Sequence, residues 1–296
     1  MIRFLAVLGI IGISFSAVFV RLAEVSPATA AFFRAAYALP PLLLLWAMTR
    51  GGDHRSASMR WMAAGSGLFL ALDLTVWHRS IELIGAGLAT VLANTQIAFV
   101  GLIAWAVHRE RPTALAFGMI PIVFGGVALI SGLGRADAYG DDPLAGAGLG
   151  VLTGMAYTGF LLVFRASNRA LAPPAGPLLD ATAGTAAGSL VAGVLFDAQF
   201  SLGLTWPEHG WLLALALTAQ VAGWLLIAAA LPRVPALETS VLLLIQPMAT
   251  VVWALVIFSE YLSALQWLGV ALVLGGVAAL TLRGSVERPA AAPAEP

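Results

Sequence analysis

Three ionisable side chains lie inside apolar segments long enough to cross a membrane: Arg34, Asp73 and Asp180. A charge within such a segment costs about 2.5–3.5 kcal/mol on insertion scales, so each one needs a partner or a function. Arg34 and Asp73 each lie about six residues from the same end of their segments, so an ion pair between them is geometrically possible. The structural interpretation is such an ion pair, or an Arg34 side chain that extends to the membrane surface. The functional alternative is that Asp73 holds a proton or the amine of a substrate. Asp180 lies near the end of its segment, where we favour a structural role.

Neutral polar side chains form a second set of candidates for contact with a ligand. One apolar segment carries Asn94, Thr95 and Gln96 in succession, and another carries Ser240 and Gln246. Such side chains also join one helix to the next within membranes, so a packing role is the alternative for each of them.

Aromatic side chains deep within the segments would suit stacking against an apolar or aromatic ligand. The candidates are Phe99, Tyr157, Phe160, Trp224 and Trp253. Packing against lipid or against other helices is the alternative for any one of them. His78, at the end of its segment, is a further candidate, with a place at the membrane interface as the alternative. Its neighbour Trp77 is predicted to be an interface anchor.

The composition explains why these polar residues stand out. The 296-residue chain is 60% hydrophobic and 10% charged, whereas a soluble domain carries about 25% charged residues. Such a chain must be solvated by lipid. Its net charge of zero gives no basic surface for nucleic acid. Because it contains no cysteine, disulfides, thiol nucleophiles and cysteine-ligated metals are excluded, and we expect no metal and no cofactor.

Ten segments have the length of a membrane span, about 20 residues. Seven of them lack Asp, Glu and Arg altogether: 4–20, 83–107, 112–134, 143–164, 209–232, 239–259 and 261–282. The other three contain the ionisable residues described above: 25–49, 61–78 and 170–196. The predicted fold is therefore an all-α integral membrane protein with ten transmembrane helices.

The placement of arginine predicts the orientation of these helices. If the N-terminus is cytoplasmic, eleven arginines flank the cytoplasmic ends, whereas only Arg21, Arg79 and Arg135 flank the outer ends. An excess of basic residues on one side is the positive-inside pattern. Both termini are therefore predicted to be cytoplasmic.

The sequence repeats itself at an offset of 150 residues without a gap. Across positions 86–128, 13 of 43 residues are identical to those 150 positions later. The least accidental matches are Gln96 with Gln246, Glu110 with Glu260, and the GGVA sequences at 125–128 and 275–278. The repeat predicts two related halves, 1–135 and 136–284, followed by a disordered cytoplasmic tail at 285–296.

The second half must be inverted relative to the first, because each half contains five helices. Inverted repeats around a site at the membrane midplane are the architecture of many secondary transporters, in which one half rocks against the other. The alternative is an ancient duplication that serves folding alone. Polar residues at equivalent depths in both halves predict a shared central cavity.

With its five-plus-five arrangement and a glutamate that closes the fourth and ninth helices before a Gly-Gly helix, the chain resembles the EamA-type exporters of the drug/metabolite transporter superfamily. The resemblance covers nearly the whole sequence and is strongest over 85–130 and 235–282. It implies export of small metabolites across the bacterial inner membrane. Within the superfamily, the aromatic amino acid exporters have this length and helix number, so aromatic or neutral amino acids are the implied cargo.

Other function classes find less support. The sequence contains no HExxH, no GxSxG and no Gly-rich phosphate loop, so we expect neither an enzyme nor an ATP-driven pump. A carrier for drugs or other amphipathic compounds is the first alternative, and a non-transporting scaffold or lipid-handling protein is the second. The expected partners are a small-molecule substrate and the lipid bilayer, without nucleic acid. A proton is the candidate coupling ion, and the chain is expected to be a monomer or a homodimer.

Overall fold

The structure is a computed structural model, and it describes the whole chain except residues 1, 109–113, 133–136, 169–171, 231–235 and 284–296. The tail predicted to be disordered and Glu110 therefore lie outside the described residues. Every regular element in the described part is a helix, as the apolar composition predicts.

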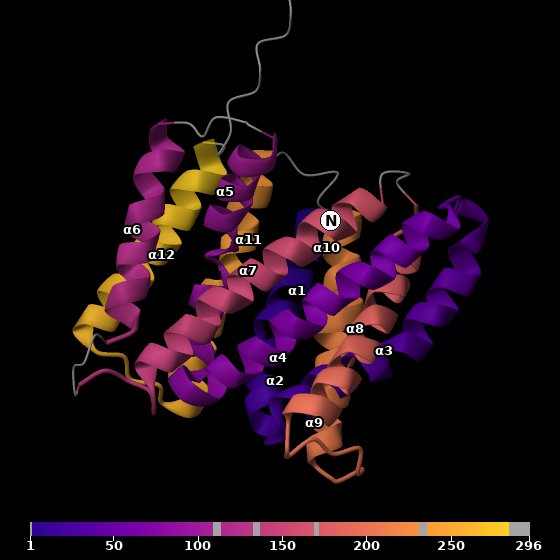
Figure 1. Ribbon diagram of the computed structural model, residues 1–296, viewed down its shortest axis with the longest axis horizontal. Coiled ribbons are helices and arrows are strands. Elements are labelled where there is room, and N and C mark those ends of the chain that lie inside the picture. The colour runs from indigo at the N-terminus through magenta and orange to yellow at the C-terminus, as the bar shows by residue number, and fades with distance from the viewer. Residues whose placement is uncertain (1, 109–113, 133–136, 169–171, 231–235, 284–296) are drawn as a thin grey trace, which may run out of the picture.

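Figure 1 shows how the helices are arranged. They are α1 (Ile2–Ser14), α2 (Ser16–Ala23), α3 (Pro27–Thr49), the 3₁₀-helix η1 (Arg50–Gly52), α4 (Ala57–Ala93), α5 (Gln96–His108), α6 (Ala114–Ile130), α7 (Pro143–Ser167), α8 (Ala175–Phe196), α9 (Glu208–Leu215), the π-helix η2 (Ala216–Gly223), α10 (Trp224–Ala230), α11 (Ala236–Phe258) and α12 (Ala264–Arg283).

Seven helices in the described part of the chain are long and apolar enough to cross a membrane. Two further apolar helices, 117–130 and 242–258, are shorter. Large apolar side chains point outward from these helices, for example Leu44, Val194 and Val256, each more than 60% exposed. A surface of this kind suits lipid rather than water. The chain is therefore a multi-pass membrane protein, while the number of ten spans stays a prediction.

The predicted segments 61–78 and 83–107 are joined without a loop. The helix continues from the first segment into the second and is broken at Gly85, with φ 81° and ψ 167°, and again at the turn of Asn94 and Thr95, where α4 ends and α5 follows. The chain changes direction across these breaks, so that α5 follows a different course from most of α4 (Figure 1). A Cβ atom at Gly85 would lie 2.6 Å from the carboxyl group of Glu260. Glycine is required at this position both for its positive φ and for this close approach.

The long helix α4 packs against α7 and α8 and so lies at the centre of the molecule. Its contact with α8 is close because Gly67 and Gly184 face the backbone of the opposite helix: a Cβ on either glycine would lie about 2 Å from a carbonyl oxygen there. Small residues allow such approaches between membrane helices. In the predicted halves, α4 belongs to the first half, whereas α7 and α8 belong to the second.

Candidate functional site

A cavity of about 330 Å³ lies in the middle of the helix bundle, and we call it the central cavity. Helices from both predicted halves surround it. Its polar lining consists of Ser16, Arg34, Asp73, Thr90, Asn94, Gln96, Thr153, Tyr157, Gln246 and Thr281, and Trp77 and Trp224 also line it. The remaining lining is aliphatic, mainly leucine and isoleucine. Ligand pockets commonly combine an apolar wall with a few polar groups in this way.

Arg34 brings a buried guanidinium to this cavity from α3. Its side chain is only 5% exposed, and its Nε donates to the amide oxygen of Gln220, 3.0 Å away. The Gln220 amide nitrogen in turn donates to Thr182 Oγ1. Gln220 lies in the π-helix η2, a helix type that is frequent at functional sites. These bonds fix the position of Arg34 but leave its two terminal nitrogens without a carboxylate partner among the described residues.

Asp73 brings a buried carboxylate to the same cavity from α4 and is 6% exposed. It interacts electrostatically with Arg34 and Tyr157. The Arg34–Asp73 ion pair that the sequence allowed is not formed, because no guanidinium nitrogen of any described residue lies within 4.0 Å of the Asp73 carboxylate. No described side chain or backbone N–H donates a hydrogen bond to Asp73 either. Within the described part of the chain, a guanidinium and a carboxyl group therefore share one cavity without an ion pair between them.

The predicted repeat partners Gln96 and Gln246 both line the central cavity, one from each half. The Gln96 side-chain oxygen is buried and has no hydrogen-bond partner. It follows the break between α4 and α5, where Asn94 donates from its amide nitrogen to Thr90 O. A ligand in the cavity would have both hydrogen-bond donors and acceptors available from these amides.

Of the other candidates, Tyr157 and Trp224 also line the central cavity, but four do not. Thr95 donates back to Leu92 O within its own turn. Phe160 is fully buried among other aromatic rings, and Phe99 packs edge-on against Phe124. Trp253 stacks on Phe15 and donates to Ser14 Oγ. These contacts match the packing alternative for each, and we assign none of the four to the cavity. The side chain of Ser240 lies outside the described part of the chain.

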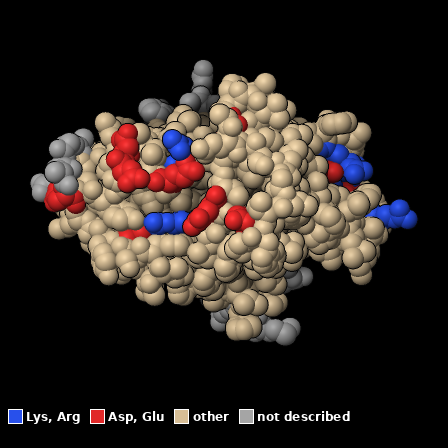
Figure 2. Space-filling view, turned by 90° about the horizontal axis from the view of Figure 1, so that it is seen from below, with Lys and Arg blue, Asp and Glu red and all other residues tan. Residues whose placement is uncertain are grey.

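His78 lies in a second cavity of about 440 Å³, which we call the Gly85 cavity because it opens beside that residue. Its lining includes Arg21, Glu24, His78, Glu82, Gly85 and Asp141. It shares no lining residue with the central cavity. Carboxylate side chains gather on the face of the molecule seen in Figure 2, with arginine between them.

Beside Gly85, the buried carboxylate of Glu260 binds the start of the helix that follows this residue, and we call this arrangement the Glu260 cap. The two carboxylate oxygens accept hydrogen bonds from the backbone N–H groups of Ala86 (2.8 Å) and Gly87 (3.1 Å). Arg21 forms an ion pair with the same carboxylate. A carboxylate at the first N–H groups of a helix is favourable because these groups are otherwise unpaired and carry partial positive charge. The cap joins the two predicted halves.

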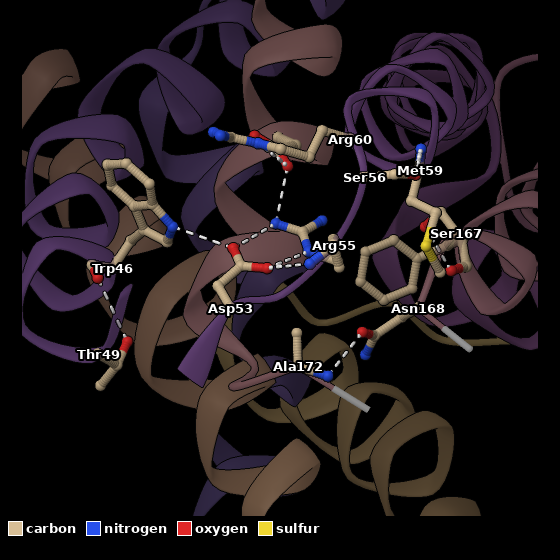
Figure 3. Close-up of polar contacts among 12 residues, drawn as sticks. Trp46, Thr49, Asp53, Arg55, Ser56, Met59, Arg60, Ser167, Asn168 and Ala172 are labelled. Atoms are coloured by element: carbon tan, nitrogen blue, oxygen red, sulfur yellow. Dashed lines mark hydrogen bonds and ion pairs between the residues drawn. The ribbon is translucent and has the colours of Figure 1, made fainter. Parts of the chain in front are cut away.

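A second ionic group, the Arg55 cluster, lies where η1 leads into α4 (Figure 3). Arg55 bonds Asp53 through Nε at 2.8 Å and lies 2.9 Å from Asp180 of α8. Arg60 lies 3.5 Å from the same Asp180 oxygen. The hydrogen bond from Arg55 lowers the pKa of Asp53 to about 2. The structural role predicted for Asp180 agrees with this placement.

The sequence analysis missed one residue of the central cavity, Trp77, and one residue that holds Arg34 in place, Gln220. Trp77 was predicted to be an interface anchor, but it is 7% exposed and lines the cavity. The end of an apolar segment does not mark the membrane interface when the helix continues for several more turns. Gln220 was not considered. Its type is the signal, since a glutamine within the apolar segment 209–232 also needs a hydrogen-bond partner.

Comparisons with known proteins place the chain in a family. The sequence profile of the EamA-like transporter family matches it twice, over residues 1–132 and 144–282. One protein of known crystal structure matches with a TM-score of 0.61 and 18% sequence identity, covering 95% of this chain and 96% of its own; at that identity the likeness shows the fold alone. No curated protein sequence matches significantly. Because the two profile matches span most of the sequence, the chain belongs to the EamA-like transporter family within the drug/metabolite transporter superfamily, whose members are multi-pass membrane transporters of small molecules.

Proposed function

We propose that the chain is a secondary transporter that exports small zwitterionic metabolites, foremost aromatic or other neutral amino acids, across the bacterial inner membrane. The observation that carries this proposal is the presence of Arg34 and Asp73 in one cavity without an ion pair between them. An amino acid carries a carboxylate and an ammonium group on one carbon. Its carboxylate would pair with the free guanidinium nitrogens of Arg34, and its ammonium with Asp73.

The rest of the cavity suits the side chain of such a cargo. Tyr157, Trp77 and Trp224 offer aromatic faces beside aliphatic walls, and offset or edge-to-face ring contacts are favourable. The volume of 330 Å³ lies at the lower end of the range for ligand pockets, about 300–1,000 Å³. A single small metabolite therefore fits better than a large amphipathic drug, which is the alternative cargo.

The mechanism we propose is alternating access between two inverted halves of five helices, 1–135 and 136–284, with both termini cytoplasmic. The presence of Gln96 and Gln246, one from each predicted half, in the lining of one cavity supports this arrangement. So does the Glu260 cap, which holds a residue of one half against a helix start of the other. Whether the working unit is a monomer or a homodimer does not alter the assignment of the cavity.

Flux into proteoliposomes tests this function. The purified chain should carry labelled phenylalanine and other neutral amino acids without nucleotide, whereas empty liposomes should not. Absence of flux for every amino acid, together with transport of large amphipathic dyes, would favour the drug carrier. Absence of both would favour a scaffold.

The same assay tests whether Asp73 couples transport to protons. Asp73→Asn should abolish the response of flux to an imposed pH gradient while the protein stays monodisperse. If the variant responds to the gradient as the parent does, Asp73 is not the coupling site.

A further inference from the structure

The Gly85 cavity and the central cavity lie in succession along one side of α4. Asp73 and Trp77 line the central cavity, and on the next turns His78, Glu82 and Gly85 line the Gly85 cavity. Positions three and four apart lie on the same face of a helix. A molecule that follows this face of α4 would pass from one cavity to the other.

His78, which lines the Gly85 cavity, carries a buried ring nitrogen without a hydrogen-bond partner. The residue is 1% exposed, and its Nδ1 lies 3.0 Å from the carbonyl oxygen of Pro27. A carbonyl oxygen only accepts hydrogen bonds, so Nδ1 is the ring nitrogen that carries the proton, and Nε2 of the neutral ring is an acceptor. Nε2 is buried and has no partner. A buried polar atom in this condition indicates a missing donor.

The charged groups of the cavity also favour a donor. Three carboxylates line it, from Glu24, Glu82 and Asp141. Among the described residues, Arg21 is the only arginine that lines it, and its guanidinium is already paired with Glu260. Of the three carboxylates, that of Glu82 has an ion pair with Arg79. Asp141 is held in place because its backbone N–H donates to Leu83 O, 2.8 Å away.

An organic cation fits these groups better than a metal ion does. Among the described residues, no three His, Asp or Glu side chains are close enough together to hold a metal. Val20, Val25, Ile81 and Leu83 supply an apolar wall for the carbon skeleton. The volume of about 440 Å³ is sufficient for one small molecule.

We propose that the Gly85 cavity is a second binding site, which takes a small organic amine with its ammonium group directed at His78 Nε2 and the surrounding carboxylates. The site is distinct from the central cavity. Binding there does not depend on the proposed amino acid export, although a cargo with an amine would meet both sites in turn along α4.

Calorimetric titration of phenethylamine into the chain in lipid nanodiscs tests the proposal. The Asp73→Asn variant serves as the background, so that binding at the central cavity does not contribute. In this background we expect saturable binding of phenethylamine and none of 2-phenylethanol, which has the same ring without the ammonium. If phenethylamine does not bind to the Asp73→Asn protein, the second site does not exist, whatever the flux assay shows.

Two substitutions at His78 separate its two nitrogens. His78→Asn keeps an N–H for Pro27 O but removes the acceptor at Nε2, and affinity should fall about 10-fold or more because a hydrogen bond to a charged group is lost. His78→Gln places an amide oxygen near the Nε2 position and should lose less. Equal affinity in the parent and in His78→Asn would overturn the proposal.

A matched pair of exposed aspartates decides the matter if the His78 variants do not fold. Asp141 lines the cavity, whereas its neighbour Asp142 does not and instead accepts from Ala145 N at the start of α7. Asp141→Asn should weaken phenethylamine binding several-fold, and Asp142→Asn should leave it unchanged. Equal effects of the two substitutions would contradict a site in this cavity.

Discussion

Buried charges occur at both ends of the helix bundle and in its middle, and they are partnered differently. In the Arg55 cluster, a guanidinium with a fully buried side chain meets two carboxylates. In the Glu260 cap, a carboxylate that is equally buried meets two N–H groups and one arginine. In the middle, Arg34 has only the neutral amide of Gln220, and Asp73 has no hydrogen-bond donor among the described residues.

We interpret this difference as one between charged groups that stabilise the fold and charged groups that bind a ligand in the proposed function. An unpaired charge in a low-dielectric interior is costly, so it persists only where something other than stability requires it. The paired groups at the two ends join the predicted halves, and their removal should lower stability. In the proposed function, the unpaired groups in the middle bind a ligand of opposite charge, and their removal should lower transport instead.

The largest loss of stability is expected for Arg55→Gln. The substitution leaves Asp53 without its cation and Asp180 with the more distant Arg60 alone, and breaking a buried ion pair costs about 3–5 kcal/mol. The free energy of unfolding in detergent, from denaturant titration, measures the effect. Arg60→Gln is the control, because that side chain is 43% exposed and its distance to Asp180, 3.5 Å, is longer than that of Arg55. This substitution should lower the free energy of unfolding by less than about 1 kcal/mol. Equal losses of unfolding free energy in the two variants would show that the buried Arg55 contributes no more to stability than the exposed Arg60.

A smaller loss is expected for Glu260→Gln, about 1–2 kcal/mol. The amide oxygen can still accept from one backbone N–H group of α4, but the ion pair with Arg21 and the negative charge at the helix start are lost. The same unfolding assay measures it, with the exposed residue Glu24 as control in Glu24→Gln. A cap that contributes nothing would show the same midpoint in both variants.

The smallest effect is a dependence of stability on acid. The pKa of Asp53 is about 2 in the folded chain, below its ordinary value of 3.8. The stability that this carboxylate contributes is therefore fully present above about pH 4 and is lost as the pH falls towards 2. The melting temperature of the parent should fall more steeply over this range than that of Asp53→Asn. Parallel curves would show that the hydrogen bond between Arg55 and Asp53 does not stabilise the fold.

The sequence allowed Arg34 and Asp73 to lie close together, but it did not predict that they share a cavity with Gln96 and Gln246. It was sufficient for the helical membrane fold and for the prediction that the two glutamines line one cavity. Hydropathy and the 150-residue repeat carry that information directly. It was insufficient where a contact depends on backbone geometry far away in the chain. Glu260 reaches Ala86, 174 residues distant, only because Gly85 adopts a positive φ.

The sequence also did not predict the burial of two side chains within the helix bundle, those of Trp77 and Gln220. Trp77 stands at the end of an apolar segment, yet α4 continues past it to Gly85, and this places the ring against the central cavity instead of the membrane interface. Gln220 pairs with Arg34 from a helix that the hydropathy pattern marks as uniformly apolar. Such pairings between distant helices follow from packing, which no local pattern reports.

The central claim is that the unpaired charges of the central cavity bind the charges of the cargo, and counterflow in proteoliposomes tests it most directly. Phenylalanine and phenethylamine should be compared in the parent and in Arg34→Gln, with the melting temperature recorded for both proteins. We predict that Arg34→Gln slows phenylalanine exchange about 100-fold, since a charge-assisted pair with the carboxylate is lost, while phenethylamine exchange and stability change little. Equal slowing of both compounds, or a collapse of stability with no selective loss, would contradict the account.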